Sequence, residues 1–253
     1  MNMLTRDLVY EADGARMIGY YAADGQRTGR RPGILVAHPG PGLGEQARSV
    51  ARRLAGIGYA AFALDYHGGG AVLTDTADMM TRIQRFLENP LPIRARLQRA
   101  LEMLHEQPEV DGAKIGSIGY CFGGTSVLEL ARSGASIAAT VGFHSGLKTA
   151  RPQDAANIKG KVLVCLGADD PLIPLPERNA FEDEMRKGGA DWQMHVYGGA
   201  QHSFTDPNVE ARARAAGLTG MKYDEAVDRR SWRSMLELFA EVFGTAAAGG
   251  IAS

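Results

Sequence analysis

The chain has little of what marks several protein classes. Only two of its 253 residues are cysteines, Cys121 and Cys165, too few for a disulfide framework or a cysteine-built metal cage. No apolar run approaches the roughly 18 residues needed to cross a bilayer. The first residues lack the basic start and apolar core of a signal peptide. We therefore expect a cytoplasmic protein that holds no metal and does not enter a membrane.

An excess of one charge is also missing. The 28 basic and 29 acidic residues nearly cancel and leave a formal net charge of −1. This balance favours neither a nucleic acid nor a membrane surface as a partner. The composition, 45% hydrophobic and 23% charged, is typical of a globular protein with one sizeable core. We expect a single domain over residues 1–253.

Short apolar runs recur along the chain at regular intervals. A hairpin around Asp13-Gly14 is predicted within residues 1–25, and Trp192–Tyr197 alternates as a further strand would. Continuous apolar runs, typical of strands buried on both faces, occur at Gly33–Ala37, Ala60–Leu64, Lys114–Gly119, Ile137–Phe143 and Val162–Leu166. Helical patterns separate them at Gln46–Ile57, Pro92–Gln107, Ser126–Ser133, Pro176–Lys187 and Asp224–Phe243.

Strands that alternate with helices predict an α/β fold with a mainly parallel sheet covered on both faces. Such sheets bind ligands at the carboxyl ends of their strands, so residues that carry chemistry should follow strands. Residues 74–92 and 206–221 fit no strand–helix unit and form either walls over the site or surface insertions. The tail Thr245–Ser253, rich in small residues, is expected to fray.

A candidate nucleophile follows the third buried run. Gly119-Tyr120-Cys121-Phe122-Gly123 lies between a predicted strand and a helix, which is the nucleophile-elbow pattern with Cys in place of Ser. Glycine is needed on both sides because a Cβ would clash in so tight a turn. A helix N-terminus also lowers a thiol pKa. The alternative is a buried structural cysteine, which is how we interpret Cys165.

An acid and a histidine follow later strands in the order that an elbow requires. Asp169-Asp170 comes after the strand at Val162–Leu166, and His202 comes after Trp192–Tyr197. His202 would accept and return the thiol proton, and one aspartate would orient it. Asp170 is our choice, with Asp169 as the competing acid. A solvated turn and a histidine at a strand end are the structural alternatives.

The first buried run ends in His38-Pro39-Gly40-Pro41-Gly42, which resembles the oxyanion loop of esterases. The prolines cannot donate a backbone hydrogen bond. We therefore predict an oxyanion hole made by the N–H groups of Gly40 and Phe122. His67 and His144 also follow strands, and we interpret each as a turn residue, with a place in the pocket as the alternative.

Together these segments resemble the dienelactone hydrolase family. The resemblance spans roughly residues 33–243, and the motifs that carry it are His38–Glu45, Leu64–Gly68, Gly119–Gly124, Gly167–Pro174 and His202-Ser203-Phe204. It implies an α/β-hydrolase fold, a Cys-His-Asp triad and hydrolysis of an ester or lactone without a cofactor. The family's Asp-x-x-x-Pro spacing, matched by Asp170 and Pro174, favours Asp170 over Asp169.

Two departures from the family pattern bear on function. Many members carry a glutamate within reach of the thiol where this chain has Pro39, and Glu45 is a candidate substitute. Family members that cleave dienelactone bind its carboxylate with arginines, one of them close after the histidine. Here that place holds Asp206, so we expect a preference for neutral esters, with Arg82 or Arg85 as possible replacements for a substrate arginine.

The expected function is hydrolysis of a small ester or lactone through an acyl-thioester on Cys121. His38, Tyr120, Phe204 and Asp206, which flank these motifs, are expected to contact the substrate. The expected assembly is a monomer or a homodimer. A ligand-binding or thiol-redox sensing protein on a hydrolase scaffold is the alternative, although such a sensor would not need His202 and Asp170.

Overall fold

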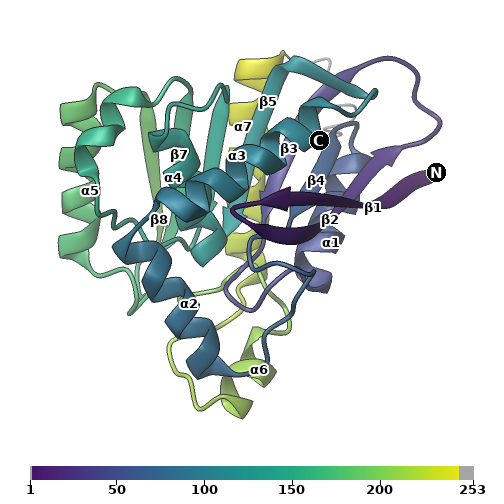
Figure 1. Ribbon diagram of the computed structural model, residues 1–253. Helices are drawn as coiled ribbons and strands as arrows, with labels where there is room; N and C mark the ends of the chain where they lie inside the picture. Colours follow the sequence, from purple (N-terminus) through teal and green to yellow (C-terminus); the bar gives the residue numbers. More distant parts are fainter. Residues whose placement is uncertain (1, 245–253) are drawn as a thin grey trace.

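One eight-stranded sheet organises the chain, which the computed structural model describes over residues 2–244. The strands lie in the order β1-β2-β4-β3-β5-β6-β7-β8 (Figure 1). Strands β3 to β8 run parallel, whereas β1 and β2 form an antiparallel hairpin whose second strand pairs with β4. The bounds are β1 (Met3–Ala12), β2 (Ala15–Asp24), β3 (Arg31–Ala37), β4 (Ala60–Leu64), β5 (Val110–Tyr120), β6 (Ala139–Phe143), β7 (Lys161–Gly167) and β8 (Trp192–Tyr197).

Helices cover both faces of this sheet. Helices α1 and α7 pack on one face, and α3, α4 and α5 pack on the other. Successive residues of a strand point to opposite faces, so Ile34 joins the core under α1 and α7 while Leu35 joins the core under α3 and α4. The bounds are α1 (Glu45–Gly56), α3 (Leu91–His105), α4 (Phe122–Arg132), α5 (Leu175–Gly188) and α7 (Glu225–Phe243).

The predicted α/β architecture with a mainly parallel sheet is confirmed, with shifted element ends. The runs at Ala60–Leu64 and Trp192–Tyr197 coincide with β4 and β8. Helix α4 begins at Phe122, earlier than the predicted start at Ser126. Two glycines, which have low helix propensity, hide that first turn in the sequence. A Cβ at Gly124 would lie 2.4 Å from the Ser145 hydroxyl oxygen, so close packing requires glycine there.

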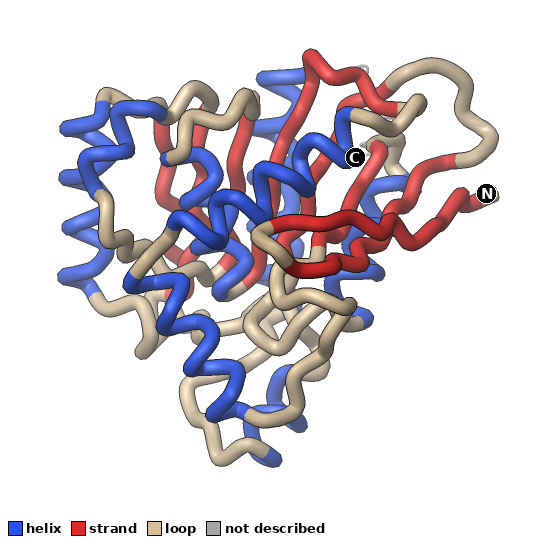
Figure 2. The backbone as a smooth tube through the Cα atoms, viewed as in Figure 1, coloured by secondary structure: helices blue, strands red, loops and turns tan. Residues whose placement is uncertain are grey.

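Each segment that fitted no strand–helix unit contains a helix. These are α2 (Thr76–Glu88) and α6 (Val209–Ala215), which follow the carboxyl ends of β4 and β8. Both project from the same end of the sheet (Figures 1 and 2). This is the position that we expected for segments that form walls over the site. The sequence also gave no sign of η1, a 3-10 helix at Pro152–Asn157.

Two remaining expectations concern the ends of the chain and the membrane. The frayed tail was predicted for residues 245–253, which lie outside the described residues. Over residues 2–244, no helix combines the length and the apolar character needed to cross a bilayer.

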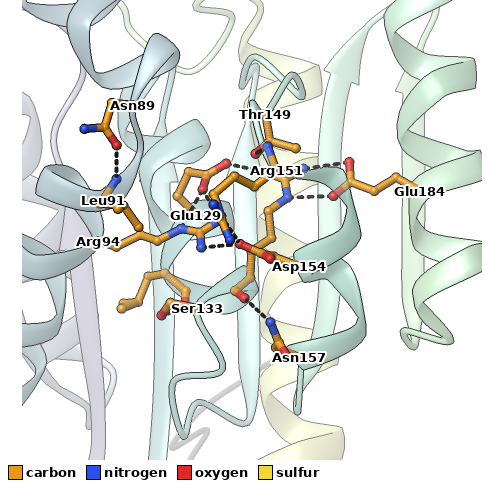
Figure 3. Close-up of polar contacts among 12 residues, drawn as sticks. Asn89, Leu91, Arg94, Glu129, Ser133, Thr149, Arg151, Asp154, Asn157 and Glu184 are labelled. Atoms are coloured by element: carbon orange, nitrogen blue, oxygen red, sulfur yellow. Dashed lines mark hydrogen bonds and ion pairs between the residues drawn. The ribbon is translucent and has the colours of Figure 1, made fainter.

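A chain of alternating charges fixes α4 against its neighbours. Arg132, at 0% exposure, pairs with Glu129 at 3.1 Å and with Glu184 of α5 at 2.7 Å. Arg94 of α3 pairs with Glu129 at 2.7 Å and with Asp154 of η1 at 2.6 Å (Figure 3). Each buried charge thus has an opposite partner, which is the condition for keeping it ionised inside a protein. The helix that starts at the predicted elbow is therefore held on two sides.

Candidate active site

The predicted elbow is a strained turn between β5 and α4. Cys121 lies between them with φ 52° and ψ −122°, a backbone conformation that non-glycine residues rarely adopt. A Cβ at Gly119 would lie 2.1 Å from the carbonyl oxygen of Gly123, and a Cβ at Gly123 would lie 2.3 Å from that of Ala37. Glycine on both sides is therefore a packing requirement. The turn leaves Cys121 partly exposed while its neighbours are buried.

Cys121, His202 and Asp170 are brought together from the carboxyl ends of three different strands. The Nε2 atom of His202 lies 3.1 Å from the Cys121 Sγ atom. The Nδ1 atom of the same ring lies 2.8 Å from Asp170 Oδ2. His202 and Asp170 are 2% and 3% exposed, whereas Asp169 is exposed. The geometry thus selects Asp170 as the partner of His202.

The electrostatics favour a charged pair. Burial raises the pKa of the Cys121 thiol, but the adjacent His202 ring and the N–H groups of Phe122 and Gly40 more than reverse this, so the pKa falls below its ordinary value. Burial lowers the pKa of His202, but the Cys121 thiolate and the Asp170 carboxylate raise it to about 10. Both shifts favour a thiolate next to an imidazolium.

The two N–H groups predicted to form an oxyanion hole both face the nucleophile. The backbone N–H groups of Gly40 and Phe122 lower the pKa of the Cys121 thiol, as donors close to the sulfur do. The Gly40 loop is fixed from behind, because the His67 Nε2 atom lies 2.7 Å from the Gly40 carbonyl oxygen. A Cβ at Gly40 would approach Met79 and Ile83 of α2 to 3.1 Å. The α2 insertion thus forms one wall over this loop.

His38 supports the oxyanion loop instead of contacting substrate. It is 0% exposed, and its ring stacks on Tyr66 with the centroids 3.7 Å apart. Its Nδ1 atom donates to the Pro39 carbonyl oxygen at 2.7 Å. Burial lowers the pKa of this histidine well below its ordinary value. The predicted substrate contact is therefore wrong, because the side chain points into the core beneath its own loop.

Tyr120 and Phe204 require the same correction. Tyr120 is 3% exposed and stacks on Phe143 with the ring centroids 4.9 Å apart. Phe204 is 0% exposed and packs edge-on against His144. Tyr120 adjoins Cys121 in the sequence and Phe204 lies two positions after His202, but both side chains pack into the core. They pack beneath the site and do not line it.

Asp206 does not present a free negative charge. Its side chain is 3% exposed and ion-paired with Arg212 of α6. Its Oδ1 atom also accepts the Asn208 N–H at 2.9 Å. The repulsion of an anionic substrate that we expected from Asp206 is therefore reduced, because Arg212 of the α6 insertion pairs with its carboxylate.

Glu45 is not a substitute for the family glutamate. Its side chain is 76% exposed and pairs with Arg52 on the outer side of α1. The thiol pKa is therefore lowered by His202 and backbone N–H groups, without help from a neighbouring carboxylate.

One further histidine, which we interpreted as a turn residue with a place in the pocket as the alternative, lies beside the candidate base. His144, which follows β6, is 1% exposed, and its ring centroid lies 5.2 Å from that of His202. Its left-handed φ of 41° agrees with a turn residue. In the sequence, its position directly after the buried run that forms β6 is the feature that indicates a place in the site. Strand β6 pairs with β5, the strand that precedes Cys121.

Two further features surround the site. An open cavity of about 660 Å³ lies between α2, the start of α3 and the β1–β2 turn, and its lining includes His67, Arg82 and Arg85. Within residues 2–244, no group of three or more histidine, cysteine, aspartate or glutamate side chains could hold a metal ion.

Comparison with known proteins identifies relatives along most of the chain. The family model described as "Dienelactone hydrolase family" matches residues 18–243. A protein of Salmonella typhimurium, named putative carboxymethylenebutenolidase, is 26% identical over 92% of this chain and 86% of its own. A crystal structure of a dienelactone hydrolase-like promiscuous phosphotriesterase from metagenomic libraries is 43% identical. It covers 95% of this chain and 98% of its own, with a TM-score of 0.88.

Proposed function

Because this chain belongs to the dienelactone hydrolase family and is a hydrolase of that class, we propose that Cys121, His202 and Asp170 cleave a small ester or lactone. One observation carries the proposal. The two ring nitrogens of His202 contact the Cys121 Sγ atom at 3.1 Å and the Asp170 carboxylate at 2.8 Å. That is the arrangement of a nucleophile, its base and the group that orients the base.

The first half of the reaction forms an acyl-enzyme. The Cys121 thiolate attacks the carbonyl carbon, and the electron pair of the C=O bond moves to oxygen. The N–H groups of Gly40 and Phe122, which already face the sulfur, stabilise this oxyanion. When the C=O bond re-forms, the C–O bond to the alcohol breaks. The His202 imidazolium then donates its proton to the departing alkoxide.

The second half releases the acid. Neutral His202 accepts a proton from water while the water oxygen attacks the thioester carbon. The second oxyanion occupies the same hole, and its collapse breaks the C–S bond. The thiolate returns beside the imidazolium, so the starting ion pair is restored and the carboxylic acid is released. Neither half of this sequence requires a metal or an organic cofactor.

The test is to trap the acyl-enzyme. Rapid mixing with p-nitrophenyl acetate should release a burst of nitrophenol, and mass spectrometry of peptides should find one acetyl group on Cys121. Cys121→Ala should lose both signals. Cys165→Ala is the matched control, because Cys165 is a buried thiol within β7, and it should keep both. Turnover that persists in Cys121→Ala would overturn the nucleophile assignment.

The same experiment separates a hydrolase from a sensing protein. A thiol sensor would react with the ester once and stay acylated, because His202 would not activate water to hydrolyse the thioester. Continued release of nitrophenol after the burst therefore supports catalysis. A burst without turnover supports the sensor.

We further propose phosphotriester hydrolysis as a second activity. The structural relative that is 43% identical is a promiscuous phosphotriesterase. A phosphotriester is neutral, so its binding does not depend on an arginine for a substrate carboxylate. An aryl dialkyl phosphate should release its phenol with wild type and not with Cys121→Ala. Equal release by the two proteins would show that Cys121 is not the attacking group.

A further inference from the structure

His144 contacts the backbone of the candidate nucleophile. Its Nδ1 atom accepts the N–H of Cys121 at 3.2 Å, and the same N–H also lies 3.0 Å from the Phe143 carbonyl oxygen. Because Nδ1 is an acceptor, the ring carries its proton on Nε2. The backbone of His144 is itself fixed, since its N–H donates to the Cys165 carbonyl oxygen at 2.8 Å.

The other side of the same ring contacts the loop that carries the candidate base. The His144 Nε2–H group donates to the Thr205 hydroxyl oxygen at 2.8 Å. Thr205 lies three positions after His202 on the loop between β8 and α6. The Phe204 ring between them packs edge-on against His144 with the ring centroids 5.1 Å apart. One buried imidazole therefore joins the nucleophile's turn to the base's loop.

We propose that His144 is a positioning residue whose bridge from the Cys121 N–H to the Thr205 hydroxyl sets the separation between Cys121 Sγ and His202 Nε2. The proposal rests on the proposed roles of Cys121 and His202. Those residues come from segments that are 81 positions apart in the sequence. A small displacement of either segment changes a sulfur–nitrogen separation on which proton transfer depends.

The bridge works only with a neutral ring. Burial and the nearby His202 hold the pKa of His144 well below its ordinary value. A proton on Nδ1 would remove the acceptor for the Cys121 N–H. It would also place a second positive charge beside the His202 imidazolium. The titratable groups that face the His144 ring are Cys121 from the elbow, His202 from its loop with Asp170 beyond it, and Tyr120 from β5, whose ring centroid lies 6.0 Å away.

Thr205→Val tests the bridge without touching either reacting residue. Valine keeps the shape of threonine and removes the hydroxyl acceptor. With the loop less firmly held, His202 stabilises the thiolate less, so the pH midpoint for alkylation of Cys121 by iodoacetamide should rise. We expect the alkylation midpoint to rise by about one pH unit, because one hydrogen bond is lost. For p-nitrophenyl acetate, kcat should fall about tenfold and KM should change little.

Thr140→Val is the matched control. Thr140 is a buried threonine of β6 whose hydroxyl lies 3.1 Å from the Ser117 hydroxyl, away from the triad. It should lose thermal stability as Thr205→Val does and keep the wild-type alkylation midpoint. Thr205→Ser, which restores the acceptor, should recover most of kcat.

A second variant acts on the histidine. In His144→Asn the amide oxygen takes the place of Nδ1 and still accepts the Cys121 N–H, but the shorter side chain does not reach Thr205. It should shift the alkylation midpoint as Thr205→Val does. Wild-type midpoints in Thr205→Val and His144→Asn, while Cys121 still labels and turns over, would overturn the bridge alone. Failure of the proposed function would give a different result, namely turnover that persists in Cys121→Ala.

Discussion

The Nε2 atom of His202 lies 3.1 Å from the Sγ atom of Cys121, although 81 positions separate the two residues in the chain. Parallel strands bring them together, because β5 and β8 both end at the same edge of the sheet. At that edge the sulfur also receives two backbone N–H groups. The candidate nucleophile, base and oxyanion hole thus lie close together, so the proposed role of each atom can be tested.

Asp170→Asn should reduce kcat/KM by on the order of 10³ to 10⁴, because an amide no longer holds the His202 ring in the correct tautomer. Asp169→Asn is the matched control, since Asp169 is the exposed neighbour of the same turn, and its effect should be within about twofold. Steady-state hydrolysis of p-nitrophenyl acetate measures both. A larger loss in Asp169→Asn would reverse the assignment of the acid.

Cys121 should react with iodoacetamide at a lower pH than an ordinary thiol does. Burial raises the pKa of the thiol, but His202 and the two N–H groups bring it below 9.0. As the pH falls through this lowered pKa the thiolate is protonated, so the alkylation rate should drop on the acid side. On the alkaline side the rate should stay level until His202 loses its proton near pH 10.

His202→Gln provides the comparison for that profile. Without the cation, the thiol pKa should rise and the alkylation midpoint should move to higher pH. Cys165 serves as an internal reference, because burial raises its pKa to about 12 and it should stay unlabelled. An alkylation midpoint that His202→Gln leaves unchanged would contradict the ion pair.

Much of the catalytic geometry could be predicted from the sequence because its signals are local. A buried strand reads as an apolar run, and glycines flank the one cysteine that follows such a strand. In a parallel sheet, residues after different strands meet at one edge, so chain order indicated Cys121, Asp170 and His202. The choice between Asp169 and Asp170 needed the family spacing, because neighbouring residues point in different directions.

Other parts of the site depend on three-dimensional contacts that leave no local pattern. His38, Tyr120 and Phe204 adjoin the motifs, yet their side chains pack into the core. Arg212, the partner of Asp206, lies on α6, in a segment whose sequence showed no strand–helix pattern. His144 reads as a turn residue, and its contact with the Cys121 N–H depends on the pairing of β5 with β6.

Arg132→Met should destabilise the fold by about 3–5 kcal/mol, because it leaves buried carboxylates without their cation. Arg132 is fully buried, and its guanidinium contacts Glu129, Glu184 and the Leu147 carbonyl oxygen. Arg186→Met is the matched control on α5, where Arg186 pairs with Glu182 at the surface, and it should cost less than about 1 kcal/mol. Urea unfolding followed by circular dichroism measures both. Equal losses would show that the buried charges are not mutually dependent.

The last prediction concerns substrate charge near α6. Arg212 is 54% exposed and neutralises the buried Asp206 carboxylate, and Arg82 likewise pairs with Asp78 on its own helix. With these cations paired, wild type should prefer a neutral ester over an ester that carries a carboxylate. Asp206→Asn leaves Arg212 without its partner and should raise kcat/KM for the anionic ester relative to the neutral one. Arg212→Ala exposes the Asp206 charge and should lower that ratio.

The size of the change follows from Coulomb's law. A unit charge ~8 Å from the substrate carboxylate is worth about 2 kcal/mol at an effective dielectric near 20, and solvent around Arg212 reduces this to roughly three- to tenfold in the ratio. Because both esters are measured on the same variant, damage to α6 that affects every substrate cancels in the ratio. Opposite shifts in the two variants are expected from charge alone. Shifts in the same direction, or no shift in either, would show that substrate bound at Cys121 does not sense this pair.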